Sequence, residues 1–181
     1  MRKIFLCAGH RSSNTGANYN NIKEAEETIW LRDKIAERLR KKDVEVITDN
    51  NNSELSVVVE TINKQCENVD ICVDLHFNAF SDKSVNGTEV VYPKNYSIKE
   101  MEIAEDLLHA TCQILGTKSR GIKKEGSGAY KRLAMLSDVK CNSVLLEICF
   151  ISCLDDVEKY QQHKEELVIM IAEQLLIHSV C

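Results

Sequence analysis

Three short apolar runs, each with a polar side chain at or near its end, constrain this chain more than any other feature. The runs are residues 4–10, 71–76 and 144–148. Two of them end in His10 and His76, and the third contains Glu147. Short apolar runs that alternate with helical stretches are typical of buried parallel strands. Because the carboxyl ends of such strands meet along one crevice, we expect the two imidazoles and the carboxylate to gather there. This grouping predicts a metal-assisted hydrolase.

The order of the remaining segments indicates the fold class. We expect strands over residues 3–8, 44–47, 71–76, 87–92, 132–136 and 143–148, helices over 22–41, 53–66, 97–116 and 155–178, and loops over 10–21 and 117–131. Strands that alternate with helices in this way predict an α/β fold. We therefore expect a single three-layer domain, in which helices cover both faces of a twisted, mostly parallel sheet of about six strands.

Several residues mark the expected helix ends. Ser97 and Glu100 form the pattern of a capping box, and Gly116 is a suitable C-terminal cap. Ser53 is placed to cap the second helix. Asn21 is placed to cap the first helix, which puts Glu24 at the third helical position of another capping box.

Size and charge limit the domain organisation and the partners. A chain of 181 residues with 44% hydrophobic content suffices for one domain with an apolar core. No linker or repeat is visible, so we expect one catalytic domain over residues 1–181 and no separate wall-binding domain. The net charge of −5 argues against a nucleic-acid partner. The apolar runs are too short to span a bilayer, which argues against membrane insertion.

The cysteines and the amino terminus indicate where the chain is made. Several of the eight cysteines, such as Cys7, Cys72 and Cys149, lie inside apolar runs, and no CxxC pair exists. This distribution favours reduced thiols. The first ten residues are too short for an export signal, so we expect synthesis in the cytoplasm without a signal peptide.

The run around His76 carries three polar residues at alternate positions. In a strand, Asp74, His76 and Asn78 share one face. Buried polar groups need partners, and both a metal site and a polar network satisfied within itself would supply them. Asp74 is a candidate to orient the His76 ring.

The remaining candidates each have a structural alternative. His10 is equally consistent with an ordinary loop histidine. Glu147 interrupts an apolar run, so it requires a metal, a proton or a salt-bridge partner. Glu24, Glu26 and Glu27 cluster where the first helix starts. The helix dipole favours acids at that position, and this is a sufficient structural reason for all three of them.

Taken together, the candidates resemble a known family. Four features occur in its order, namely residues 9–10, Glu24, residues 76–79 and residues 146–147. This order is similar to that of the zinc-dependent N-acetylmuramoyl-L-alanine amidases of the third family, and the resemblance covers nearly the whole chain. It implies that His10, Glu24 and His76 bind one Zn²⁺ per chain and that Glu147 is the catalytic base.

The resemblance also implies a substrate and a place of action. The substrate is peptidoglycan, cut at the amide between N-acetylmuramic acid and L-alanine, and the chain looks closest to phage endolysins. Asn78 and Arg132 are the expected substrate contacts, Arg132 together with the 119–131 loop. We expect action on the cell wall after release through a holin-made lesion. Residues 11–16 depart from the family's usual loop, which leaves the substrate details open.

Three other functions remain compatible with the sequence. A zinc peptidase or carboxypeptidase acting on stem peptides would use the same ligands and cut another bond. A peptidoglycan-binding module would keep the fold without turnover. A plain α/β domain would use the polar residues only in structural networks. Metal content and the mass of the released products separate these functions from an amidase.

Overall fold

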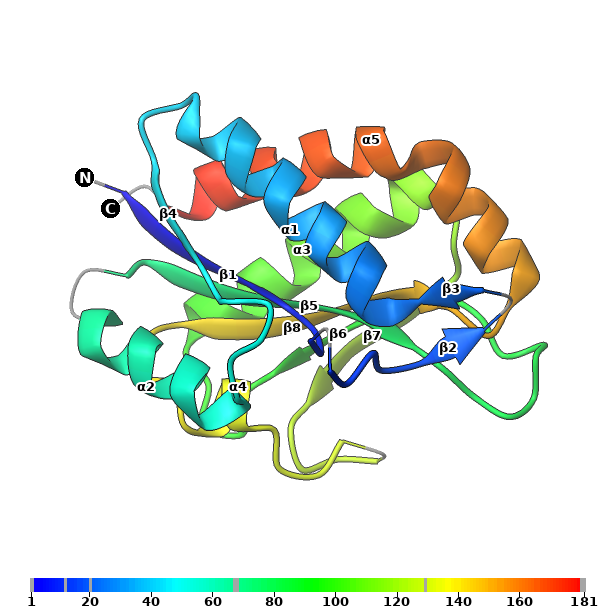
Figure 1. Ribbon diagram of the computed structural model, residues 1–181, viewed down its shortest axis with the longest axis horizontal. Helices are drawn as coiled ribbons and strands as arrows, with labels where there is room; N and C mark the ends of the chain where they lie inside the picture. Colours follow the sequence, from blue (N-terminus) through cyan, green and yellow to red (C-terminus); the bar gives the residue numbers. More distant parts are fainter. Residues whose placement is uncertain (1, 12, 20, 67–68, 129, 180–181) are drawn as a thin grey trace.

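The sheet is the centre of the structure, a computed structural model that describes residues 2–11, 13–19, 21–66, 69–128 and 130–179. Its strands are β1 (Lys3–Ala8), β4 (Glu45–Thr48), β5 (Ile71–Asn78), β6 (Thr88–Tyr92), β7 (Ser119–Lys124) and β8 (Ser143–Phe150). They lie in the order β4-β1-β5-β8-β6-β7. Strands β4, β1, β5 and β8 are parallel to one another, β6 runs antiparallel to β8, and β7 runs parallel to β6. The strands β1, β5 and β8 therefore end at the same edge of the sheet (Figure 1).

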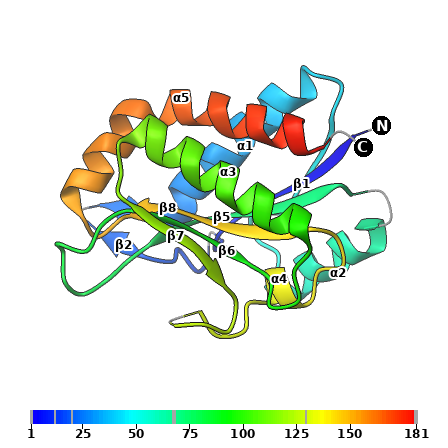
Figure 2. The same cartoon turned by 180° about the vertical axis from the view of Figure 1, so that it is seen from behind.

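Helices cover both faces of this sheet. The elements are α1 (Glu24–Arg40), α2 (Leu55–Gln65), α3 (Ile98–Leu115), α4 (Ala134–Ser137) and α5 (Leu154–His178). The long helices α1, α3 and α5 pack together on one face, while α2 and α4 lie on the other (Figures 1 and 2). A short hairpin of β2 (Asn18–Tyr19) and β3 (Ile22–Lys23) precedes α1. The predicted three-layer, mostly parallel α/β fold is confirmed.

The alternation of side chains along β1 shows why its sequence is apolar throughout. Ile4 and Leu6 belong to the large core beneath α1, α3 and α5. Phe5 and Cys7 belong to a smaller core beneath α2. All four are buried, and burying an isoleucine, leucine or phenylalanine side chain stabilises the fold by about 1.5–3 kcal/mol. A strand buried on both faces has no polar face, so the apolar run is continuous.

The end signals of α3 are confirmed. The Ser97 side chain accepts a hydrogen bond from the Glu100 backbone, and the Glu100 side chain accepts one from the Ser97 backbone. Gly116 ends the helix in the left-handed conformation with φ of 64°. Both signals are local, which is why the sequence alone reveals them.

The expected N-caps of α1 and α2 are wrong by two residues and by one residue, respectively. Asn21 has a φ of 64° and precedes β3, and the N-cap of α1 is Lys23. Glu24 is therefore the first helical residue, and it forms no capping box. Likewise, the N-cap of α2 is Glu54 instead of Ser53. The cause at α1 is tertiary, because the Glu24 side chain bonds to groups far along the chain.

Two segments before β8 also differ from expectation. Residues 117–131, expected as a loop, contain β7, and residues 132–136, expected as a strand, contribute to α4. The strand β7 lies at the edge of the sheet and is only partly buried, so its polar, basic sequence hides its strand character. The apolar run that enters α4 is too short for periodicity to separate helix from strand.

Within the described ranges, every helix is either too short or too polar to cross a bilayer. The cysteines at positions 7, 66, 72, 112, 141, 149 and 153 carry free thiols, and Cys181 lies outside the described residues.

Candidate metal centre

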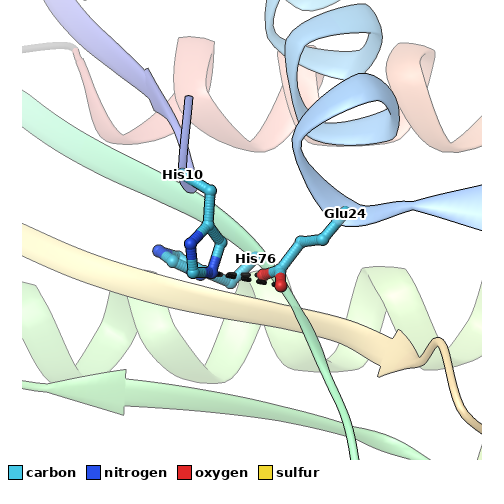
Figure 3. Close-up of side chains that lie close together, drawn as sticks. All are labelled: His10, Glu24 and His76. Carbon is cyan, nitrogen blue, oxygen red and sulfur yellow. Dashed lines mark hydrogen bonds and ion pairs between the residues drawn. The ribbon is translucent and has the colours of Figure 1, made fainter. Parts of the chain in front are cut away.

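The fold brings three predicted ligands from distant parts of the chain to one point. His10 follows the end of β1, Glu24 begins α1, and His76 lies near the end of β5. One ligand atom from each of these side chains lies within 4.8 Å of the other two. Figure 3 shows both imidazole rings turned toward the Glu24 carboxylate. Among the described residues, this is the one group of three or more His, Cys, Asp or Glu side chains close enough to hold a metal ion.

The Glu24 carboxylate is held from four directions. Its Oε2 lies 3.1 Å from His10 Nε2 and accepts a hydrogen bond of 2.9 Å from the Ala17 backbone. Its Oε1 lies 3.0 Å from His76 Nδ1 and accepts a hydrogen bond of 3.0 Å from the Phe77 backbone. Burial would raise the pKa of Glu24, but the hydrogen bonds with His10 and His76 outweigh burial and hold this pKa well below its ordinary value.

The neighbouring glutamates have different partners. Glu26 pairs with Lys23 on the exposed side of the helix. Glu27 accepts a hydrogen bond of 2.8 Å from the Tyr160 hydroxyl, which ties α1 to α5. Of the three acids at the start of α1, only Glu24 faces the imidazoles.

Two glycines make room for this cluster. A Cβ on Gly9 would lie 2.6 Å from His76 Nδ1, and a Cβ on Gly16 would lie 2.5 Å from Glu24 Oε2. Real Cβ atoms essentially never come this close to another heavy atom, so a side chain at either position would displace a ligand. His10 itself has a φ of 67°, an uncommon conformation for a residue with a Cβ. Such strain is concentrated at functional sites, because it aims a side chain where an unstrained loop would not.

Asp74 holds the other side of the His76 ring. Its Oδ2 lies 3.2 Å from His76 Nε2, while His76 Nδ1 faces Glu24. Burial would lower the pKa of His76, but the charge of Asp74 and the hydrogen bonds with Asp74 and Glu24 raise it well above its ordinary value. The sequence indicated Asp74 only as a candidate for this contact, and the structure shows the contact directly.

Glu147 lies beside the cluster without belonging to it. It is directly opposite His76 in the register of β5 and β8, and it is 9% exposed. Its Oε2 is buried and has no hydrogen-bond partner. Burial raises the pKa of Glu147 to about 7, with the charges of Glu24 and Glu89 adding to the effect and His76 opposing it. A carboxyl group with this pKa can accept and return a proton near neutral pH.

A cavity of about 480 Å³ joins these groups. His10, His76, Asp74 and Glu147 contribute to its lining. Part of the wall is apolar and is formed by Leu55, Val58, Leu133, Ala134, Met135 and Leu145. A concave site with an apolar wall and a few convergent polar groups is typical of ligand and substrate pockets.

The two predicted substrate contacts lie away from this cavity lining. The Asn78 amide donates hydrogen bonds of 2.6 Å to Glu89 Oε1 and 3.0 Å to the Tyr130 hydroxyl. Arg132 is exposed and pairs with Asp138. Their contact with substrate stays a prediction. Tyr130, which the sequence did not single out, does line the cavity and donates a hydrogen bond of 2.7 Å to Glu89 Oε1.

The donor set fits a zinc ion. Tetrahedral Zn²⁺ with ligand bonds of about 2.0–2.1 Å places neighbouring ligand atoms roughly 3.3–3.4 Å apart. The separations of 3.1 Å between Glu24 Oε2 and His10 Nε2 and of 3.0 Å between Glu24 Oε1 and His76 Nδ1 are close to this spacing, and one ligand atom from each of the three residues lies within 4.8 Å of the others. Two imidazoles and one carboxylate form a three-ligand set that catalytic zinc sites use, with one position left for water.

Comparisons with known proteins find a similar sequence and similar folds. The chain is 23% identical over 175 residues to the uncharacterized protein YqiI of Bacillus subtilis (strain 168), covering 93% of this chain and 82% of that protein. An N-acetylmuramoyl-L-alanine amidase from Clostridium difficile 630 has a similar crystal structure, with a TM-score of 0.84 at 19% identity over 97% of this chain and 95% of that chain. The catalytic domain of an endolysin targeting Clostridia Difficile has a TM-score of 0.81 at 26% identity over 98% of both chains.

The family assignment depends on the sequence as well as on the fold. The model of a family described as N-acetylmuramoyl-L-alanine amidase matches residues 4–175. This range contains the three side chains of the cluster and Glu147. The resemblance noted from the sequence is thereby confirmed. The chain belongs to the N-acetylmuramoyl-L-alanine amidase family.

Proposed function

We propose that this enzyme hydrolyses the amide bond between N-acetylmuramic acid and L-alanine in peptidoglycan, with one Zn²⁺ held by His10, Glu24 and His76. One observation carries the proposal. Two imidazole nitrogens and a carboxylate oxygen meet beside a buried glutamate that has an unpartnered oxygen. The carboxylates of a purely structural polar network are usually hydrogen-bonded, because an unpaired buried acceptor is costly.

The metal supplies part of the chemistry. When bound, Zn²⁺ acts as a Lewis acid on the scissile carbonyl and lowers the pKa of water to roughly 7. Everything else comes from the side chains of the chain. Glu147 takes a proton from the attacking water and returns it to the alanine nitrogen as the amide bond breaks. Its raised pKa, about 7, suits it to both transfers.

Asp74 sets the orientation of one ligand. Its carboxylate accepts a hydrogen bond from His76 Nε2, which leaves Nδ1 as the unprotonated nitrogen on the metal side. A carboxylate behind a ligating histidine also fixes the ring plane and increases its basicity as a ligand. The role proposed for Asp74 is therefore to position His76, and it does not touch the substrate.

Purified peptidoglycan sacculi provide the decisive test. We expect the zinc-loaded protein to release peptides that begin with L-alanine and to leave the glycan strands intact, as measured by mass spectrometry of the digest. A zinc peptidase or carboxypeptidase acting on stem peptides would instead shorten peptides that stay attached to the glycan. Glu147→Ala should retain zinc and lose product release, while Glu26→Gln, on the exposed side of α1, should retain both zinc and product release.

A peptidoglycan-binding module without turnover is the alternative of another class. It predicts bound muropeptides and no new products at any zinc concentration. The unpartnered oxygen of Glu147 supports the enzyme over this module, because binding alone gives no reason to keep such a group buried. The site of action that we propose is the cell wall, and the boundaries of a single catalytic domain over residues 1–181 stay a prediction.

A further inference from the structure

Arg11 occupies a position next to the cluster that the proposed reaction does not use. It follows His10 directly and contributes to the lining of the same cavity. Its backbone is fixed by two reciprocal hydrogen bonds with Asn14, of 3.0 Å from Arg11 N and 2.9 Å from Asn14 N. The Arg11 side chain is therefore anchored on a short, closed loop beside a metal ligand.

Arg11 is the one lysine or arginine among the described residues that line the cavity. The lining carboxylates include Asp49 and Asp74, and both have a partner of their own. Asp49 pairs with the buried guanidinium of Arg32 at 2.9 Å, and Asp74 contacts His76. An anionic group of a substrate would therefore find one permanent cation in this lining.

The present partner of Arg11 is easily exchanged. The Arg11 Nη1 lies 2.5 Å from Glu54 Oε1, and the Glu54 side chain is 69% exposed. Ion pairs with so exposed a member contribute little to stability, about 0–1 kcal/mol. A guanidinium binds a carboxylate through two parallel hydrogen bonds, so a substrate carboxylate can replace Glu54 at small cost.

The chemistry of the substrate limits which carboxylate this is. The lactyl carboxyl of N-acetylmuramic acid and the carboxyl of L-alanine are both bound in amides. The second residue of the stem continues the peptide through its side-chain carboxyl, which leaves its α-carboxyl either free or amidated. Two residues of extended chain span at most about 7 Å. The nearest free carboxylate therefore lies within reach of a long side chain adjacent to a metal ligand.

From these observations we propose that Arg11 binds the free α-carboxylate of the second stem residue and makes the enzyme prefer stems in which this group is not amidated. The inference rests on the proposed amidase function and adds a specificity determinant to it. Arg132 is the competing cation from the sequence, but its side chain is exposed, pairs with Asp138 and lies outside the cavity lining.

The test compares two substrates that differ in one group. Zinc-loaded enzyme is given N-acetylmuramoyl-L-alanyl-D-glutamate and the same molecule with its α-carboxyl amidated. We expect kcat/KM to be about 10- to 100-fold higher for the free acid, the range for a hydrogen bond to a charged group. The difference should appear mainly in KM, because the carboxylate is remote from the reacting atoms.

Variants assign the preference to a residue. Arg11→Gln should remove it by lowering kcat/KM for the free acid only, and Arg11→Lys should restore part of it. Glu54→Gln should raise kcat/KM for the free acid about two- to fivefold, because a competing carboxylate is lost. Arg38→Ala, on the side of α1 that pairs with Glu173, should leave kcat/KM unchanged for both substrates. Binding of the product dipeptide to each variant, measured by calorimetry, should follow the same order and does not depend on turnover.

The outcomes separate this inference from the proposed function. If wild-type enzyme cuts neither substrate, the amidase proposal is wrong. If it cuts both with equal kcat/KM, or if the preference disappears in Arg132→Ala and persists in Arg11→Gln, the amidase proposal stands and the role of Arg11 is overturned.

Discussion

Two buried glutamates of the same site have opposite surroundings. Glu24 is held by two imidazoles and two backbone amides, and its pKa lies well below the ordinary value. Glu147 is similarly buried, yet one of its oxygens has no partner, and its pKa is raised to about 7. The surroundings of Glu24 therefore keep it charged near neutral pH, whereas those of Glu147 allow it to gain or lose a proton in that range.

This contrast shows how one residue type serves two roles in one crevice. The surroundings of Glu24 suit a permanent ligand, because donors surround it on every side. The surroundings of Glu147 suit a proton carrier, because burial makes its charged and neutral forms similar in free energy near neutral pH. Substitutions at Glu24, at Glu147 and at their neighbours test whether the two carboxylates have these separate roles.

The largest effect is expected on the ligand side. Glu24→Gln and His76→Ala should each lose bound zinc and all measurable product release, because two remaining ligands do not hold the ion against chelators. Zinc per protein, measured by elemental analysis after dialysis, checks this. Glu26→Gln is the matched control on the same helical turn, and full zinc retention by Glu24→Gln would contradict the assignment.

On the other side of the comparison, Glu147→Gln should keep the zinc and lose the proton transfer. Its kcat should fall by about 10²- to 10⁴-fold, the usual contribution of a general acid–base group. The measurement is kcat on sacculi together with zinc content of the same preparation. Normal kcat, or simultaneous loss of zinc, would show that Glu147 is not the base.

The same substitution should stabilise the protein without its metal. The pKa of Glu147 is 4.5 ordinarily and about 7 when folded, so this group favours folding below pH 4.5, and its contribution is lost as the pH rises toward 7. At pH 8 the buried charge costs at most about 3 kcal/mol of unfolding free energy. Glu147→Gln removes this cost, whereas Glu24, whose folded pKa is lowered, contributes stability above its unfolded pKa that is lost as the pH falls.

Urea unfolding of the metal-free protein at pH 5 and pH 8 measures this effect. The stability gain of Glu147→Gln over the wild type should be larger at pH 8 than at pH 5. Glu165→Gln, on an exposed part of α5, should show no such pH dependence. A gain that is equal at both pH values, or a loss, would mean that Glu147 is not destabilised by its burial.

The smallest effect is expected at Asp74, which contacts the ligand His76 but is not itself a ligand. Asp74→Asn keeps a polar group near His76 Nε2 but removes the charge, so zinc affinity should fall about 10- to 100-fold, as other carboxylate partners of ligating histidines show. Competition with a chromophoric chelator measures this affinity. Unchanged affinity would reduce Asp74 to a structural partner of β5.

The sequence revealed those parts of the fold that depend on local patterns. The apolar runs of β1, β5 and β8 and the capping box at Ser97 are local, and they were predictable. The edge strand β7 was not predictable, because it is a strand through its pairing with β6 and its own residues carry no strand pattern. The predicted start of α1 was wrong because contacts with residues more than fifty positions away direct the Glu24 side chain.

The site was predictable to the same extent. Strand ends alone placed His10, His76 and Glu147 along one crevice, and no family knowledge was needed for that. Glu24 was indistinguishable from its neighbours until the resemblance selected it. The pairing of Arg11 with Glu54 depends on how α2 packs below the sheet, and no local pattern encodes that contact.

X-ray absorption at the zinc edge tests the central claim most directly. For protein loaded with one equivalent of Zn²⁺, we expect a shell of nitrogen and oxygen neighbours at about 2.0–2.1 Å, with imidazole scattering, that is unchanged in Glu147→Gln. A sulfur shell at about 2.3 Å would place the ion on the cysteines of this chain and contradict the account.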